Sequence, residues 1–151
     1  MNEDTAKSHT LPAYCSRIDA EKAAKLYADV LKQLNKRHRY RTATYNTRQL
    51  SADLGTNTRY ISAAIMVCTG HNFNALVNGL RLRDVCRLMV MKQHANATVE
   101  FLGLLAGFST RQSFYQAFRR TFGTTPTLFR EQLKENGTDA SSFTEIPFPH
   151  A

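Results

Sequence analysis

The sequence predicts an all-α fold of about seven helices, in which two helix-turn-helix subdomains are joined by one long linker helix. Apolar residues recur at three- and four-residue steps through most of the chain, a spacing typical of half-buried helices. No segment alternates between apolar and polar residues as a strand would, and most glycines and prolines lie between the helical stretches. A short helix, a tight turn and a second helix also occur twice, which indicates an internal duplication.

The N-terminal part of the chain divides into a leader and a helix. Residues 1–18 are polar and aperiodic, so we expect a flexible leader. A helix is predicted from Asp19, which can cap it. Its apolar stripe consists of Ala23, Leu26, Tyr27, Val30, Leu31 and Leu34. The basic stretch KRHRYR at residues 36–41 should end this helix, and a solvated loop is favoured there over a phosphate-binding site because charge runs usually face water.

Six further helices are predicted, at about residues 47–54, 57–68, 72–94, 98–106, 110–121 and 126–135. They place a tandem helix-turn-helix domain at residues 19–135, with a first unit at about 47–69, a linker helix at about 72–94 and a second unit at about 98–122. Residues 136–151 include Gly137, Pro147 and Pro149 among polar residues, and we expect them to form a flexible tail.

The two copies of the repeated pattern share their caps, buried positions and closing glycines. A shift of 53 residues (57 to 110) pairs Asn57 with Thr110, Ile61 with Phe114, Ile65 with Phe118 and Gly70 with Gly123. In each copy a glycine, Gly55 or Gly107, allows the chain to reverse with φ > 0. Asn57 in the first copy, and Ser109 or Thr110 in the second, can cap the next helix. The opposite face of that helix is left for solvent or for a partner.

The charge of the chain favours an acidic polymer as a partner. Twenty Lys and Arg against twelve Asp and Glu leave a net charge of +8, with an isoelectric point near 9.7. Basic composition alone is weak evidence, because many basic proteins bind nothing acidic.

Catalytic and metal-binding patterns are missing from the sequence. The five histidines and three cysteines have no ligand spacing, and there is no nucleophile elbow or phosphate-binding glycine loop. We therefore expect neither an enzyme nor a cofactor or metal site. No apolar run approaches the ~18 residues of a membrane span, and the N-terminus has no signal-peptide core. The expected location is the cytoplasm, without membrane contact.

The segment AGFSTRQSFYQAFRRTFGTTPTLFR carries a specific frame of glycine, phenylalanine and proline. Its members are Gly107, Phe108, Phe114, Phe118, Gly123 and Pro126, followed by Phe129 and Arg130. This frame resembles the signature of the DNA-binding domain of the AraC/XylS family of bacterial transcription regulators. The segments GTNTRYISAAI and NFNALVNGLRLRDVCRLM resemble the variant common in regulators from the Bacteroidetes group. The likeness spans about residues 21–135. It implies a seven-helix, homeodomain-like fold whose two recognition helices address successive major grooves of double-stranded DNA.

The resemblance also implies which residues of the second unit contact DNA. Arg111, Gln112 and Gln116, with Tyr115 on the same face, are the candidates for reading base edges, since Arg pairs with guanine and Gln with adenine. The candidates for phosphate contacts are Arg119 and Arg120, together with the helix N-termini at Ser109, Thr110 and Asn57. A solvated face without DNA contacts is the alternative for this set.

The first unit is expected to contribute less sequence specificity. Arg59, Tyr60 and Ser62 occupy the face that corresponds to the base-reading face of the second unit. Ala63, Met66 and Val67 stand where the family often has polar or basic side chains. Arg81 stands at the family's recurring arginine position in the linker helix, where it contacts a backbone phosphate or braces the two subdomains.

Two functions from different classes remain open at this point. The first is a sequence-specific transcription regulator that binds as a monomer or weak homodimer and associates with the nucleoid when bound. Its chain is a stand-alone regulator or a piece of a larger protein, because residues 1–18 cannot enclose an effector. The second is an adaptor that binds another regulator or RNA polymerase through an apolar surface around Phe101, Leu104, Met66 and Val67. Gly103, where the family prefers alanine, keeps the neighbouring space small.

Overall fold

The computed structural model describes residues 11–150, and within this range it contains helices and no strand. The helices are α1 (Ala20–Asn35), α2 (Thr47–Leu54), α3 (Thr58–Thr69), α4 (Phe73–Val90), α5 (Val99–Ala106), α6 (Arg111–Phe122) and α7 (Pro126–Glu135). Short 3-10 helices lie at η1 (Ala13–Arg17), η2 (Lys36–Arg41), η3 (Lys92–His94) and η4 (Ala140–Ser142). The predicted all-α fold of seven helices is confirmed. None of the described helices is both long and apolar enough to cross a membrane.

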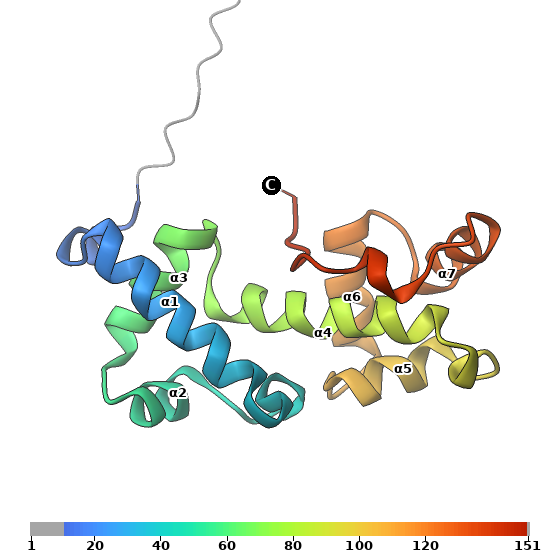
Figure 1. Ribbon diagram of the computed structural model, residues 1–151, viewed down its shortest axis with the longest axis horizontal. Coiled ribbons are helices and arrows are strands. Elements are labelled where there is room, and N and C mark those ends of the chain that lie inside the picture. The colour runs from blue at the N-terminus through green and yellow to red at the C-terminus, as the bar shows by residue number, and fades with distance from the viewer. Residues whose placement is uncertain (1–10, 151) are drawn as a thin grey trace, which may run out of the picture.

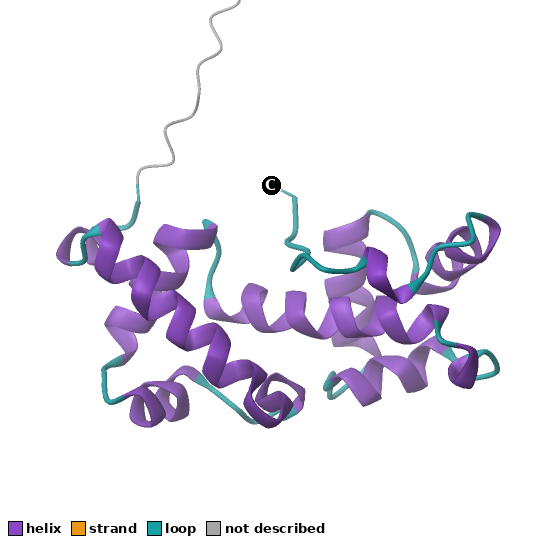
Figure 2. Ribbon diagram, viewed as in Figure 1, coloured by secondary structure: helices purple, strands orange, loops and turns teal. Residues whose placement is uncertain are grey.

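Helix α4 connects the two halves of the molecule (Figure 1). Helices α1, α2 and α3 gather around its first half, and α5, α6 and α7 gather around its second half. The same view coloured by secondary structure shows that only short loops connect the helices within each half (Figure 2). The arrangement is that of two helix-turn-helix units on a shared linker helix.

Local capping explains why most helices begin and end near the predicted residues. The linker helix is the exception, since α4 ends at Val90, before the predicted end at 94, because Met91 has an extended backbone. The side chain of Asp19 accepts a hydrogen bond from the Lys22 amide at 2.8 Å and starts α1. Asn46 and Gln49 form a reciprocal capping box at the start of α2. Helices α2 and α5 both end at a left-handed glycine, Gly55 and Gly107, as the turn of each unit requires.

Two separate apolar cores lie on either side of the midpoint of α4. The first consists of Val30, Leu34, Tyr40, Leu50, Ile61, Ile65, Leu76, Val77 and Leu80. The second consists of Leu82, Val85, Met89, Val99, Leu102, Ala106, Phe108, Phe114, Phe118 and Leu133. Helix α4 is therefore buried in both halves, because its first turns serve one core and its last turns serve the other.

The basic stretch after α1 is more than the solvated loop that we expected. Tyr40 is buried, and its hydroxyl donates a 2.5 Å hydrogen bond to Asp84 of α4. Arg41 donates from Nε to the same carboxylate oxygen at 2.9 Å. Burial, reinforced by the hydrogen bond to Asp84, raises the pKa of Tyr40 to about 12. Lys36, Arg37 and His38 are exposed as expected. The expectation is wrong for Tyr40 and Arg41 because their partner Asp84 lies more than forty residues away in the sequence.

Both ends of the described chain also depart from the sequence expectation. Residues 1–10 of the predicted leader lie outside the described residues, but η1 is folded, with Cys15 buried, and packs against α3. The expectation of a flexible tail at residues 136–151 is wrong for residues 140–149. That segment forms η4 and then packs Phe143, Ile146 and Phe148 against the two cores. Three apolar side chains without helical spacing produce this packing, which periodicity does not detect.

Candidate nucleic-acid interface

Helix α6 has one buried face and one polar, cationic face. Phe114 and Phe118 are at most 1% exposed and pack in the second core. The opposite side of the helix presents Gln112, Gln116, Arg119 and Arg120, all exposed, and Arg111 is exposed as the first residue of the helix. The side chain of Arg111 keeps 72% of its surface accessible. The predicted division between core face and outer face is present, and the four long polar or charged side chains of the outer face can meet an acidic surface.

Tyr115 is placed differently from the other candidates on this helix. Its ring is half-buried, and its hydroxyl donates a 2.7 Å hydrogen bond to Oε1 of Glu100 on α5. The guanidinium carbon of Arg111 lies 5.0 Å from the centre of the Tyr115 ring, and Arg111 Nε lies 3.6 Å from the same Glu100 oxygen. The Tyr115 hydroxyl and the backbone amide of Glu100 lower the pKa of that carboxyl group, as does Arg111. Tyr115 therefore contacts both Arg111 and Glu100, an arrangement that the sequence did not indicate.

The helix N-termini are capped as predicted. Thr110, rather than Ser109, accepts from the Ser113 amide at 3.0 Å, and Asn57 accepts from the Tyr60 amide at 3.0 Å. Ser109 is exposed beside this cap. The capping oxygens of Thr110 and Asn57 are occupied, so a phosphate at either helix would meet backbone amides.

Helix α3 presents a smaller polar surface. Arg59 and Tyr60 are exposed, Ser62 is half-buried, and Ala63 is buried. Met66 and Val67 are half-buried, so the later turns of α3 offer little polar surface.

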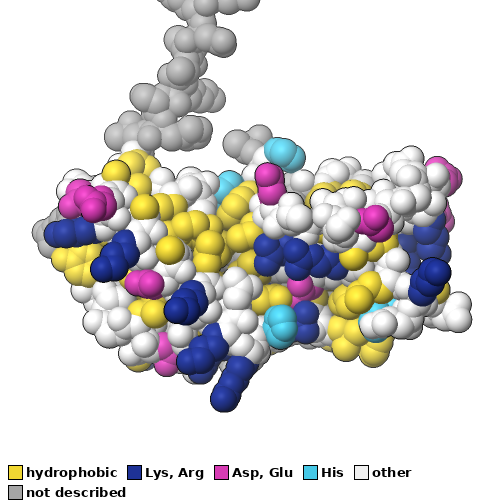
Figure 3. Space-filling model, viewed as in Figure 1, with side chains coloured by type: hydrophobic (Ala, Val, Ile, Leu, Met, Phe, Trp, Pro, Cys, Tyr) yellow, Lys and Arg dark blue, Asp and Glu magenta, His cyan; other side chains and the backbone are white. Residues whose placement is uncertain are grey.

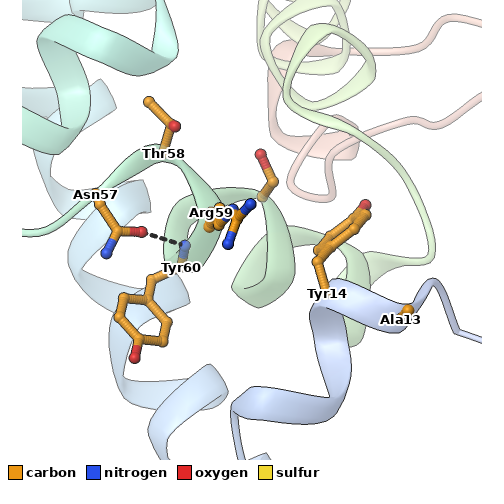
Figure 4. A pocket seen from close by; sticks show the side chains of 7 residues that line it. Ala13, Tyr14, Asn57, Thr58, Arg59 and Tyr60 are labelled. Carbon is orange, nitrogen blue, oxygen red and sulfur yellow. Dashed lines mark hydrogen bonds between the residues drawn. The ribbon is translucent and has the colours of Figure 1, made fainter.

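Tyr14 adds an aromatic side chain to the first unit that the sequence did not identify. Tyr14 of η1 lies beside Arg59 at the edge of an open hollow of about 660 Å³, with Tyr60 on the other side of Arg59 (Figure 4). Tyr14 is 38% exposed, while its neighbour Cys15 anchors η1 in the interior. The only sequence signal is the spacing of Leu11, Cys15 and Ile18, an i, i+4, i+7 series typical of a helical segment.

A second hollow separates the two recognition helices. It has a volume of about 550 Å³ and lies between Met66 of α3, the first turns of α4, and Gln116 and Arg120 of α6. Pro149 from the C-terminal segment lines the same hollow. The base-reading candidate Gln116 thus faces a space that is bounded by both units and by the tail.

Arg81 is engaged within the protein. Its Nε donates to the Tyr40 carbonyl oxygen at 2.7 Å, its Nη2 lies 3.4 Å from the Thr42 carbonyl oxygen, and its guanidinium carbon lies 5.7 Å from the centre of the Phe108 ring. Burial lowers the pKa of Arg81. The sequence left two roles open for Arg81, a phosphate contact and a brace between the two subdomains. The geometry favours the brace, because the guanidinium group binds backbone carbonyls of the segment after α1 and lies over the Phe108 ring of the second half.

The apolar surface of the adaptor hypothesis is present in part. Phe101 and Leu104 of α5 are 48% and 59% exposed. Met66 instead lines the hollow between the recognition helices. Gly103, between the two exposed residues, is needed for packing, since a Cβ atom there would lie 2.8 Å from the Phe114 ring. Within residues 11–150, no group of three His, Cys, Asp or Glu side chains is arranged to hold a metal ion.

Comparisons with known proteins agree with this architecture. A family described as "Helix-turn-helix domain" matches residues 50–132 of the chain. A solved structure of a Listeria innocua protein of unknown function has a similar fold, with a TM-score of 0.59 and 17% sequence identity. The similarity covers 70% of this chain and 95% of the Listeria chain. The comparison with curated proteins gives no match.

Proposed function

The chain belongs to the AraC-type family of helix-turn-helix DNA-binding regulators, and from this premise we propose that it recognises a specific sequence of double-stranded DNA through α3 and α6. The observation that carries the proposal is the exposed surface of α6, where the face opposite Phe114 and Phe118 presents two amides and two guanidinium groups and the first residue, Arg111, adds a third guanidinium group. Amide and guanidinium groups are the side chains that discriminate adenine and guanine in the major groove.

The residues of this surface divide into two roles. Arg111, Gln112 and Gln116 read base edges, and Tyr115 holds Arg111 in place through stacking and through Glu100. Arg119 and Arg120 near the end of α6 bind phosphates. The backbone amides at the start of each recognition helix, beside Asn57, Ser109 and Thr110, add further phosphate contacts.

The first unit anchors the protein more than it reads sequence. Arg59, Tyr60 and Ser62 at the start of α3, with Tyr14 beside them, form its contact surface. Ala63 is buried, so it adds nothing to this surface.

The linker helix supports recognition of two successive grooves. The eighteen residues of α4 span about 27 Å at 1.5 Å per residue, and one turn of the duplex is ~34 Å. A braced rod of this length keeps the two recognition helices near the groove-to-groove distance. Since the duplication already supplies two reading helices, one molecule suffices to fill a site, and a weak homodimer on DNA is not required.

Selection from a random DNA pool, followed by titration of the enriched site, tests the proposal. The double variant Arg111→Ala/Gln116→Ala should lose discrimination between the selected site and random DNA. The matched control is Gln132→Ala/Lys134→Ala on α7, which also removes one amide and one cation from exposed positions and should retain discrimination. Absence of an enriched motif at moderate salt would overturn the proposal.

The second candidate function is an adaptor that binds another regulator or RNA polymerase through Phe101 and Leu104. Their exposure on α5 favours it. The two functions differ in salt dependence, because binding through several phosphates weakens steeply as salt rises whereas an apolar interface does not. If the protein is a DNA-binding regulator, Leu104→Asp should leave the selected DNA motif unchanged. If it is an adaptor, the same substitution should abolish binding to the other regulator or to RNA polymerase.

A further inference from the structure

The C-terminal segment at residues 143–149 runs along α4 from the second unit to the first. Phe143 packs against the second core, while Ile146 and Phe148 pack against the first. The ring of Phe148 stacks on His71, with ring centres 4.7 Å apart and planes 4° from parallel. Figure 1 shows this segment lying against α4 and ending between α3 and α6. The segment therefore contacts both halves of the molecule.

Two arginine side chains of α4 form hydrogen bonds with the backbone of this segment. Arg87 donates from Nε to the Phe143 carbonyl oxygen at 2.8 Å, and Arg83 donates from Nη1 to the Thr144 carbonyl oxygen at 3.2 Å. Lys and Arg side chains gather over α4 beside the segment (Figure 3). These two arginines are occupied by protein carbonyls, so they are part of the packing rather than a free cationic surface.

The C-terminal segment comes closest to α4 at Gly79. A Cβ atom on Gly79 would lie 2.5 Å from the Pro147 carbonyl oxygen and 2.7 Å from Cγ2 of Ile146. Glycine is unfavourable inside a helix compared with alanine, and Gly79 stands in the middle of α4. Its presence there is explained by the segment that crosses it.

The C-terminal segment is a further connection between the two halves, in addition to α4 and the contact of Arg41 with Gly107. The two cores are separate and meet along α4, and on one side of this helix the backbone of Arg41 also lies against the turn at Gly107. The C-terminal segment joins the two halves at a different place, above Gly79. The segment adds contacts to both cores, and Pro149 reaches the hollow that Gln116 and Arg120 line. We propose that residues 143–149 form a strap that fixes the relative position of α3 and α6, and thereby sets which distance between two half-sites the protein accepts. This inference rests on the proposed DNA-binding function.

Substitution of Gly79 tests whether the strap is seated as described. In the full chain, Gly79→Ala should lower the melting temperature, because the methyl group collides with the strap. In the background Ile146→Ser/Phe148→Ser, in which the strap is released, the same Gly79→Ala change should raise the melting temperature, because alanine favours the helix. The same sign in both backgrounds would overturn the close packing.

Binding to DNA tests the consequence of the strap. Probes carry the selected site with base pairs added or removed between its two halves. The wild-type protein should prefer one spacing, and for Ile146→Ser/Phe148→Ser the affinity ratio between spacings should fall toward unity. Leu128→Ser, at an exposed apolar position of α7, is the matched control and should retain the preference. An unchanged preference in the folded released variant would overturn the strap while leaving the DNA-binding function intact.

A measurement without DNA separates the two proposals further. Spin labels at Ala52→Cys and Gln132→Cys, in a Cys68→Ser background that removes the exposed native thiol, report the distance between the units. A narrow distribution in the full chain and a broader one in the released variant support the strap, even if no DNA motif is found. Equal widths would overturn it. If the released variant does not fold, Gly79→Ala alone displaces the strap and is compared in the same way.

Discussion

The backbone of Arg41 lies against Gly107, so the segment between α1 and α2 contacts the turn of the second unit. A Cβ atom on Gly107 would stand 2.5 Å from Cα of Arg41 and 2.6 Å from its carbonyl oxygen. Gly107 has φ +113°, a conformation that side chains rarely adopt. The turn of the second unit therefore needs glycine for two reasons, its backbone conformation and the approach of another segment.

Replacing Gly107 should cost more stability than replacing a glycine that has only the backbone requirement. Gly123 ends α6 with φ +71°, and a Cβ atom there would meet no neighbouring atom within 4 Å. We expect Gly123→Ala to lower the free energy of unfolding by ~1 kcal/mol and Gly107→Ala by ~3 kcal/mol, since the second change adds a backbone collision. Chemical denaturation of both variants measures the difference. Equal losses would show that Arg41 moves aside freely.

The hydroxyl of Tyr40 should stabilise the fold through buried Asp84. Tyr40→Phe removes the 2.5 Å hydrogen bond and leaves that carboxylate with Arg41 as its remaining side-chain donor. We expect a loss of roughly 1–3 kcal/mol in unfolding free energy. The raised pKa of Tyr40, from 10.0 to about 12, means that its contribution is complete below pH 10 and is lost as pH rises through 12. As the pH rises from 10 to 12, the free energy of unfolding should fall more for the wild-type protein than for Tyr40→Phe. Chemical denaturation at several pH values measures this, and an equal fall in both proteins would contradict it.

The helices could be predicted from the sequence because their determinants are local. Asn57 and Thr110 each cap a helix within three residues, and Gly55 and Gly107 end the preceding helices. The strap could not be predicted, because its partner Gly79 lies more than sixty residues from Pro147. A glycine inside an otherwise continuous helix was the one local sign of a close neighbour.

The periodicity of the sequence predicts the exposed face of α6, but it does not predict which neighbouring side chains contact the residues on that face. Burial of Phe114 and Phe118 places Gln112 and Gln116 outward by helical geometry alone. The pairing of Tyr115 with Glu100 depends on how α5 crosses α6, a tertiary relation that spacing within one helix cannot provide. Tyr14 was missed for the same reason, since η1 contacts α3 across more than forty residues of chain.

The two recognition helices should differ in their share of sequence discrimination. Gln116→Ala removes a bidentate partner for adenine and should cost about 1–3 kcal/mol of discrimination at one base pair. Arg59→Ala should lower affinity with a smaller change in discrimination, because the rest of α3 offers little polar surface. Titration against the selected site and its single-base variants measures both. Greater loss of discrimination from Arg59→Ala would assign the main reading role to α3.

Tyr14 should contribute to affinity from outside the recognition helix. Tyr14→Ala removes the ring beside Arg59 and should weaken binding roughly threefold to tenfold, the effect of one peripheral contact. Leu11→Ala is the matched control, since Leu11 is also exposed near η1 but does not line the hollow at Arg59. Equal effects of the two substitutions, or none from Tyr14→Ala, would remove Tyr14 from the contact surface.

Salt dependence should separate the phosphate-binding arginines from the base-reading glutamines. Arg119 and Arg120 are exposed, and among the described residues neither forms an ion pair within the protein. A cation that is not neutralised by its own protein releases a counterion from DNA when it binds a phosphate. Arg119→Ala and Arg120→Ala should therefore each lower the slope of log affinity against log salt by about 1. Gln112→Ala should weaken binding without changing the slope, because an uncharged amide releases no counterion. Unchanged slopes for both arginine variants would mean that these side chains face solvent in the complex, and the cationic contribution would then have to come from Arg111 or from the first unit.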